Sequence, residues 1–289
     1  TLGGAGVLHA PHGLDALETT VRALADDPPD VIGVHGGDGT LHKVLTLLIE
    51  SWPAGRAFPA IAILPGGTMN VVSSSLRLRA DPAEILRGLR IARERGEALV
   101  TVPRACMKIG ARYGFVFANG AIAHFLEHYY ASGAYGPTKA VWLAARLLVS
   151  TPLQGPYARA VNRPFRGRVV VDGLELPWRQ ITSLSAATVR EVGLGYKLNH
   201  RADEDPTRFA MLAIHTSPFG MVLGSPSVFE GRGLSPSLAS SYLAREVLIE
   251  PDEPPMPFTV DGDIYREAAP LRLSMGPTIA FVRPRALSV

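Results

Sequence analysis

The chain has a single cysteine, Cys106, among its 289 residues. One thiol cannot form an internal disulfide, so the sequence excludes a disulfide-stapled secreted scaffold. Zinc sites built on several thiolates are excluded for the same reason. Cys106 lies in an apolar stretch, and we expect it to be a buried core residue.

Long hydrophobic runs are also absent. No run reaches the roughly 18 apolar residues of a membrane-spanning helix, and residues 140–149, the longest, include Arg146. The N-terminus lacks the basic-then-apolar pattern of a signal peptide. We therefore expect a cytoplasmic protein with at most peripheral contact at the inner face of the membrane. For the helix predicted over 139–149, we favour core packing over a lid that meets lipid.

Charge of one sign is not concentrated anywhere. The net charge is +3, and only four of the 29 basic residues are Lys. Arg suits forked contacts with phosphate, although biased base composition of the coding DNA explains the excess equally well. No Arg-rich tract with interleaved aromatics is present, so we expect no nucleic-acid partner. At 47% hydrophobic residues the chain is globular rather than disordered, and the sequence is silent on oligomeric state.

The first hundred residues alternate strand and helix patterns. Apolar strands alternating with helices predict a parallel sheet covered on both faces. From about Val100, short alternating runs separated by Gly, Pro and Asp-Gly turns predict mainly antiparallel structure. We expect two domains, 1–100 (α/β) and 101–289 (mainly antiparallel β), with the last strand returning to the first domain. The expected strands are 7–10, 31–34, 60–64, 112–117, 168–171, 209–214 and 246–249, and the expected helices are 14–25, 41–49, 81–95 and 129–149.

A glycine-rich turn, His35-Gly-Gly-Asp-Gly-Thr40, follows the strand at 31–34. Glycines allow positive φ and let a phosphate approach the backbone, and the N-terminus of the next helix favours an anion. Asp38 at the end of the strand can hold Mg²⁺ or accept a proton. The alternative is a structural corner in which Asp38 caps the helix.

A second glycine turn, Pro65-Gly-Gly-Thr-Met-Asn70, follows the strand at 60–64. Two such turns at the carboxyl ends of adjacent parallel strands form one crevice, where open α/β sheets bind ligands. Thr68 and Asn70 add short polar groups to it. The chain has neither a Walker phosphate loop nor a Gly-x-Gly-x-x-Gly fingerprint, so we expect a phosphate-bearing ligand held by a different loop chemistry.

These two turns and the late Val260-Asp-Gly-Asp263 resemble the three signatures of the diacylglycerol kinase catalytic-domain family, which includes bacterial lipid kinases, sphingosine kinases and ceramide kinases. The resemblance implies a parallel-sheet nucleotide-binding domain, shared with NAD kinases, followed by an antiparallel β-sandwich that binds lipid. It also implies ATP with Mg²⁺, a lipid substrate and phosphoryl transfer to a lipid hydroxyl.

The resemblance assigns roles to individual residues. Asp38 matches a catalytic carboxylate that also contacts the nucleotide-bound magnesium. Asp263 stands where the family usually has Glu as the proposed general base, and Asp261-Gly-Asp263 by itself also fits a plain hairpin turn. The nucleotide-binding residues implied by the resemblance are Gly36, Gly37, Asp38, Gly39, Thr40, Gly66, Gly67, Thr68 and Asn70.

Several positions depart from the family pattern. Val71 replaces an Asp that usually follows Asn70 in bacterial members, and His42-Lys43 replaces Asn-Glu. His124 stands where sphingosine kinases are expected to have an amine-binding Asp, which favours a neutral lipid such as diacylglycerol or ceramide. The stretch 203–207 replaces an Asp-Asp-Gly metal turn of bacterial members, and we expect a solvated acidic turn there.

The family also opens with a strand, an Asn-Pro-x-Ser-Gly turn and a helix that this sequence does not show; residues 7–10 would already be the second strand. Two other functions stay open. The Gly36–Thr40 turn also resembles that of NAD kinases, and the departures are compatible with a catalytically silent nucleotide- or lipid-binding protein.

Overall fold

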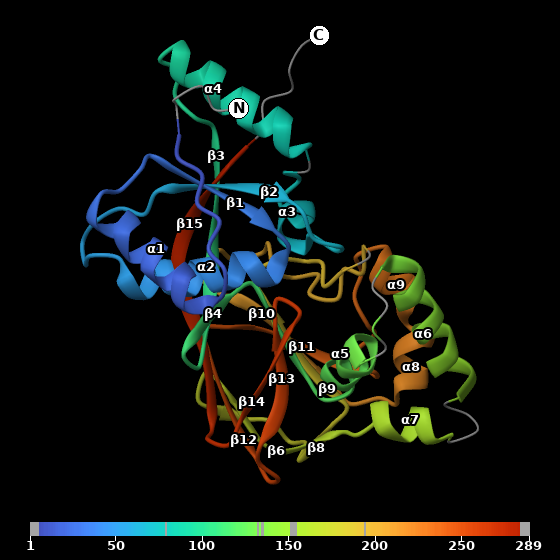
Figure 1. Cartoon of the computed structure of the whole chain (residues 1–289). Helices are drawn as coiled ribbons and strands as arrows, with labels where there is room; N and C mark the ends of the chain where they lie inside the picture. The colour runs from blue at the N-terminus through green and yellow to red at the C-terminus, as the bar shows by residue number, and fades with distance from the viewer. Residues whose placement is uncertain are drawn as a thin grey trace. The chain divides into compact units, whose positions relative to one another are not determined.

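The computed structural model describes residues 6–78, 80–131, 133, 136–150, 155–193 and 195–283 (Figure 1). The chain divides into two compact units. The first unit comprises Thr1–Arg104 and Pro277–Val289, and the second comprises Ala105–Gly276. Two strands, β3 (Thr101–Ile109) and β15 (Leu271–Val282), contribute residues to both units.

The first unit contains a parallel sheet. Strands β1 (Val31–Gly36) and β2 (Ala60–Pro65) pair in parallel along their whole length, and β15 joins β2 in parallel where Phe281 faces Ile61. Ala62, Leu64, Ile85 and Val282 form a buried cluster that joins this sheet to a helix. The helices of the unit are α1 (Leu14–Asp26), α2 (Asp38–Ser51), α3 (Val71–Ser75) and α4 (Pro82–Glu94).

Local sequence signals explain these elements. Residues 61–64 of β2 are all buried, as expected for a strand covered on both faces. Helix α4 begins as predicted: the Ala83 N–H donates to Asp81 Oδ1 at 2.8 Å, and Pro82 occupies the first turn. The strand expected at 7–10 is wrong. Val7 and Leu8 are 80% and 87% exposed, because a short apolar run forms a strand only where a neighbouring strand pairs with it.

The second unit is an antiparallel β-sandwich. One sheet has the order β11-β10-β9-β5-β13-β14, and all its pairings are antiparallel. In the other, β6 and β15 flank β12. Apolar side chains from both sheets share one core, in which Phe117 and Phe258 of the first meet Val169 and Leu273 of the second. The strands are β4 (Arg112–Gly114), β5 (Val116–Asn119), β6 (Phe165–Val171), β7 (Leu174–Glu175), β8 (Gln180–Ile181), β9 (Ser183–Ala187), β10 (Phe209–Ile214), β11 (Ala239–Ala244), β12 (Glu246–Pro251), β13 (Met256–Val260) and β14 (Asp263–Glu267).

Five helices gather on one side of the second unit (Figure 1). The single helix expected over 129–149 is wrong: it is two helices, because Gly133 and Gly136 adopt φ of +66° and +135° and end the helical path between them. Ile122 and Met221, from two different helices of the group, pack against the same core cluster. The five helices are α5 (Ala121–Ala131), α6 (Pro137–Ser150), α7 (Pro156–Val161), α8 (Pro218–Leu223) and α9 (Ser225–Phe229).

Candidate active site

The first glycine turn connects β1 to α2 within the first unit. Gly36 has φ +155°, and a Cβ there would lie 2.6 Å from Thr40 Oγ1, so the position requires glycine. Gly37 precedes the helix, and its carbonyl accepts hydrogen bonds from the Thr40 and Leu41 N–H groups at 3.1 Å. The turn therefore places the N-terminus of a 14-residue helix at the carboxyl end of β1.

The two glycine turns lie against each other. The Gly66 N–H donates to the Gly36 carbonyl at 2.9 Å. A Cβ on Gly67 would lie 2.4 Å from Gly37 Cα, closer than any side chain could pack. Backbone-to-backbone contact between neighbouring strand ends is thus possible only because both positions are glycine.

Asp38 connects the first turn to the second. Its Oδ2 accepts from the Val71 N–H at 2.9 Å and its Oδ1 accepts from the Val72 N–H at 3.0 Å. Val71 and Val72 open α3, so the carboxylate caps that short helix from a residue more than thirty positions earlier. Burial raises the pKa of Asp38 above its ordinary value, although the two backbone hydrogen bonds oppose the shift.

Asn70 shapes the second turn. It adopts φ +47°, a left-handed conformation that Asn tolerates better than most residues. Its Oδ1 accepts from the Gly67 N–H at 3.2 Å, and its Nδ2 donates to the Gly67 carbonyl at 2.7 Å. The Ser73 and Ser74 hydroxyls donate to the Asn70 carbonyl, at 3.1 and 2.7 Å. Asn70 therefore holds the turn in one shape through both its side chain and its carbonyl.

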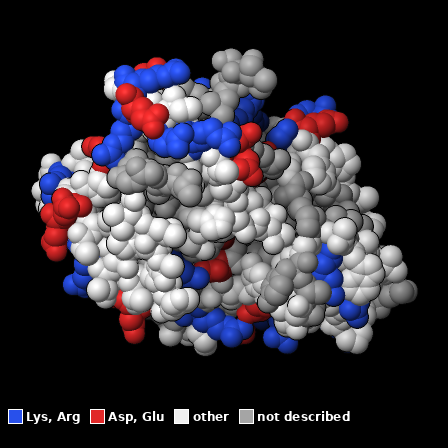
Figure 2. All heavy atoms as spheres, turned by 45° about the horizontal axis from the view of Figure 1, so that its top comes forward, with Lys and Arg blue, Asp and Glu red and all other residues white. Residues whose placement is uncertain are grey.

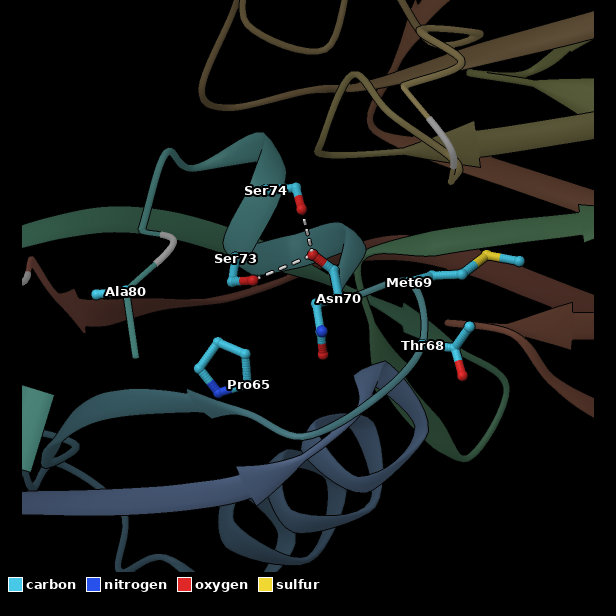
Figure 3. A pocket seen from close by; sticks show the side chains of 7 residues that line it. All are labelled: Pro65, Thr68, Met69, Asn70, Ser73, Ser74 and Ala80. Atoms are coloured by element: carbon cyan, nitrogen blue, oxygen red, sulfur yellow. Dashed lines mark hydrogen bonds between the residues drawn. The ribbon is translucent and has the colours of Figure 1, made fainter. Parts of the chain in front are cut away.

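A pocket of about 490 Å³ opens beside this turn (Figure 3). Thr68 and Asn70, both expected at the site, line it, whereas residues 36–40 are not among its lining residues. Ser73 and Ser74 were not predicted; the run of three serines following Asn70 was the available signal, because a short helix starting there turns them toward the loop. The lining residues are Pro65, Thr68, Met69, Asn70, Ser73, Ser74 and Ala80.

The second unit holds the late Asp-Gly-Asp motif. Asp261 and Gly262 have φ of +48° and +89° and form the tight turn between β13 and β14. The Asp261 carboxylate is buried and accepts hydrogen bonds from the Phe115 N–H at 3.0 Å and the Val116 N–H at 2.8 Å. These contacts also interrupt the strand expected over 112–117. Asp263 is the half-buried first residue of β14, so the motif is a hairpin turn that presents a second carboxylate.

Neither the close histidine pair His124 and His128 nor the acidic stretch 203–207 assembles a set of metal ligands. His124 Nδ1 lies 3.1 Å from Glu127 Oε2, and His128 Nδ1 lies 3.0 Å from the His124 carbonyl. Asp205 accepts from the Thr207 N–H and hydroxyl, and these hydrogen bonds lower the pKa of Asp205. Within the part of the chain that the structure describes, no group of three or more His, Cys, Asp and Glu side chains could hold a metal ion.

A comparison with protein families covers the segment that contains both glycine turns. Residues 7–101 match the model of the diacylglycerol kinase catalytic domain. This segment belongs to the diacylglycerol kinase catalytic-domain family. The match includes both glycine turns and Asp38, so the contacts described above lie inside the kinase-family segment.

Solved structures share the fold of the whole chain. A diacylglycerol kinase from Bacillus anthracis str. Sterne is 16% identical, with a TM-score of 0.65; the match covers 96% of this chain and 84% of that one. An NAD kinase from Archaeoglobus fulgidus, determined in complex with ATP, is 13% identical with a TM-score of 0.50, and the match covers 91% and 81%. The two-unit α/β-plus-β fold is therefore confirmed. A comparison with curated protein sequences found no match.

The donor set of the kinase-family segment suits a magnesium ion that arrives with a nucleotide. Mg²⁺ is usually bound through one or two carboxylates plus substrate phosphates. Asp38 supplies one carboxylate, and Val71 and Val72 use two of its roughly four acceptor positions. Because acceptor positions remain, Asp38 can both hold the α3 N-terminus and contact such an ion.

The surface shows how charge is distributed. On the face drawn in Figure 2, Lys and Arg lie in small groups separated by uncharged areas, with Asp and Glu among them. A continuous basic field of the kind that follows a nucleic-acid backbone is not visible among the described residues of that face. None of the described helices combines the length and hydropathy needed to cross a membrane.

Proposed function

We propose that the chain is an ATP-dependent lipid kinase, which transfers the γ-phosphoryl group to the hydroxyl of a neutral acyl lipid such as diacylglycerol or ceramide. The observation that carries the proposal is the backbone contact between the two glycine turns inside the kinase-family segment. It brings together the Gly37–Asp38 start of α2 and the Gly66–Asn70 turn beside a pocket. Unpaired N–H groups at a helix N-terminus suit the phosphates of ATP.

Different residues would bind ATP and catalyse the transfer. Backbone N–H groups and short polar side chains of the two glycine turns would surround the phosphates. These residues are Gly36, Gly37, Gly39, Thr40, Gly66, Gly67, Thr68 and Asn70. Asp38 would hold the nucleotide-bound Mg²⁺. When bound, the ion offsets the negative charge on the transferring phosphoryl group.

Asp263 would act as the general base. Its carboxylate accepts the proton of the lipid hydroxyl as the hydroxyl oxygen forms a bond to the γ-phosphorus. The bond from that phosphorus to the β–γ bridging oxygen breaks, and ADP leaves. Asp261 supports this role because its buried hydrogen bonds to Phe115 and Val116 fix the turn that carries Asp263. Such a base contributes about 10²–10⁴-fold to the rate.

The choice of a lipid as the acceptor rests on sequence motifs. The Pro65–Asn70 turn and the Asp261-Gly-Asp263 turn favour a lipid kinase over an NAD kinase. Position 124 offers an imidazole instead of a carboxylate, and its Nδ1 lies 3.1 Å from Glu127 Oε2, which supports a neutral lipid over the amine of sphingosine.

The test is phosphoryl transfer from labelled ATP with Mg²⁺. The acceptors are detergent-dispersed diacylglycerol, ceramide, sphingosine and monoacylglycerol, with NAD as a non-lipid acceptor. Asp263→Asn should lower kcat at least about 10²-fold and leave ATP binding intact. Asp252→Asn, the same change at an exposed position of the second unit, should leave kcat unchanged.

Each of three other outcomes would overturn one part of the proposed function. Label on NAD makes the protein an NAD kinase. ATP binding without transfer to any acceptor makes it a catalytically silent member of the family. Full activity in Asp263→Asn moves the general base to another residue.

A further inference from the structure

Helix α6 presents a stripe of four side chains, three of them exposed and Lys139 half-buried, which we call the α6 stripe: Lys139, Trp142, Arg146 and Val149. Their spacing of three, four and three residues places them on one face of the helix. Trp142 is 54% exposed and Val149 is 71% exposed, whereas Leu143 on another face is buried at 3%. The helix is therefore anchored through Leu143, and its largest aromatic side chain faces outward. The core packing favoured from the sequence holds for Leu143, which packs in a buried cluster with Tyr129, whereas Trp142 and Val149 are exposed.

Two cations hold the exposed indole in place. Lys139 Nζ lies 5.4 Å from the centroid of the Trp142 ring, and Arg146 Cζ lies 5.5 Å from it. Arg146 also lies 4.7 Å from the centroid of the Tyr157 ring of α7, so it connects the two helices. A groove of about 490 Å³ runs along the same face and is lined by Trp142, Ala145, Arg146, Val149, Ser150 and Gly155.

Exposed apolar side chains concentrate on this group of helices. Among the described residues of the second unit, seven large hydrophobic side chains are exposed, and six of them lie on helices α5, α6, α8 and α9. Scattered exposed apolar residues are ordinary, but concentration on one layer marks an interaction surface. The six residues are Tyr130, Trp142, Val149, Phe219, Leu223 and Phe229.

The charge of the same region points to the partner. Between Glu127 and Asp172 the sequence has no Asp or Glu, although the whole chain has 26 of them against 29 Lys and Arg. This segment contains α6 and α7, whose own charged residues are all basic, whereas Arg168 of β6 at its end pairs with Glu175 and Glu250. Its basic residues are Lys139, Arg146, Arg159, Arg163, Arg166 and Arg168.

We propose that the α6 stripe docks on an anionic lipid bilayer, with the Trp142 ring at headgroup depth and Lys139 and Arg146 on lipid phosphates. This assignment rests on the proposed lipid substrate, which a bilayer would supply. An indole has an apolar body and a polar N–H, and long cationic side chains keep their charge at the interface while their methylenes lie along apolar surface. A second copy of the chain would fit worse, because a two-fold contact through this face brings like charges together.

The test measures binding in the absence of ATP, so that it is independent of catalysis. Co-sedimentation should show binding to vesicles of phosphatidylglycerol and phosphatidylcholine, weaker binding at high salt, and little binding to phosphatidylcholine alone. Each cation near an anionic surface contributes about fivefold to binding, so Lys139→Gln with Arg146→Gln should weaken it about 25-fold. Arg87→Gln, the same change at an exposed position of α4, should have no comparable effect.

Fluorescence locates the contact. Vesicles should shift the tryptophan emission to shorter wavelength, and brominated lipids should quench it. Trp142→Phe should abolish the shift, whereas Trp178→Phe should keep it. The apolar contribution is tested by Trp142→Ser, which should weaken vesicle binding. Leu174 is 76% exposed outside the helical layer, and Leu174→Ser should leave vesicle binding unchanged.

Three results would overturn the proposal: no binding of the wild type to anionic vesicles, undiminished binding of the stripe variants, or self-association that only the stripe variants abolish. The last result would identify the face as a contact between copies. If phosphoryl transfer to detergent-dispersed lipid accompanies any of these three results, the proposed lipid kinase function stands. Vesicle binding without phosphoryl transfer would refute only the proposed kinase activity.

Discussion

Replacing Gly67 with Ala tests whether contact between the two glycine turns builds the proposed nucleotide site. The added Cβ would lie 2.4 Å from Gly37 Cα and 3.1 Å from Gly37 N. Carbon atoms in ordinary contact stand about 3.5–4.0 Å apart, so the overlap is at least about 1 Å. Both sides of the contact are backbone, and no side-chain rotation can relieve it. The turns must separate.

Two opposing effects set the expected loss in the free energy of unfolding of Gly67→Ala. Overpacking of this kind costs about 1–3 kcal/mol. Replacing glycine restricts the unfolded chain and returns about 0.4–1 kcal/mol. A net loss of up to about 2.6 kcal/mol in the free energy of unfolding follows for Gly67→Ala, with about 1.3 kcal/mol at the midpoint of the two ranges. Loss of a single hydrogen bond to a charged phosphate would in addition weaken ATP binding about tenfold or more.

Gly88→Ala provides the matched control, since it makes the same chemical change inside α4 with nothing within 4 Å of the new Cβ. It should stabilise the protein by about 0.5–1 kcal/mol, because Ala is the better helix former. The assay is urea unfolding with calorimetric titration of ATP. Unchanged stability and ATP affinity in Gly67→Ala would refute the reasoning, because the two turns would then bind nucleotide without touching.

Four further predictions concern single side chains. Asp261→Ala leaves two buried N–H groups without their acceptor and should cost about 2–4 kcal/mol in urea unfolding. Asn70→Gly keeps the left-handed φ but loses the side-chain hydrogen bonds, so it should destabilise less than Asn70→Ala, which loses both. Burial raises the pKa of Cys106 to about 12, so a thiol reagent at neutral pH should label it only after unfolding. Burial raises the pKa of Asp38 above its ordinary value of 3.8. The stability that this side chain contributes is therefore fully present below pH 3.8 and is lost as the pH rises through the raised pKa. The difference in free energy of unfolding between wild type and Asp38→Ala should shrink from acidic to neutral pH.

The fold of the first unit could be predicted where the signal is local. The apolar run at 60–64 and the Asp81-Pro82 cap each identify their element without help from elsewhere in the chain. The short run at 7–10 carries the same apolar signal and forms no strand, because strand formation depends on a pairing partner that a sequence pattern does not contain. The break between α5 and α6 required knowing that Gly133 and Gly136 take positive φ, which glycine permits but does not require.

The candidate site could be predicted as a set of residues but not as a set of contacts. Asp38 and Val71 are 33 residues apart, and nothing in either motif says that the carboxylate of one accepts from the N–H of the other. The Asp261-Gly pair indicates the tight hairpin turn that it forms, but not that the Asp261 carboxylate accepts from the Phe115 and Val116 N–H groups. The nucleotide and catalytic roles of these residues stay predictions.

The contacts of Asp38 change which variant can decide the function. Asp38→Asn would place an amide NH₂ opposite the Val71 or Val72 N–H, so it disturbs the contact between the turns whatever it does to magnesium. Lost activity in that variant is therefore expected both for a kinase that needs Asp38 at the metal and for one that needs it only to hold α3. The two roles separate in the absence of nucleotide and metal. If Asp38 holds α3, Asp38→Ala lowers the stability of the apo protein at acidic pH; if it serves only the metal, removing a buried carboxylate leaves that stability unchanged or higher. Asp263 opens β14, and its replacement does not remove the hydrogen bonds that Asp261 accepts from Phe115 and Val116, so it is the better test of the proposed catalytic step.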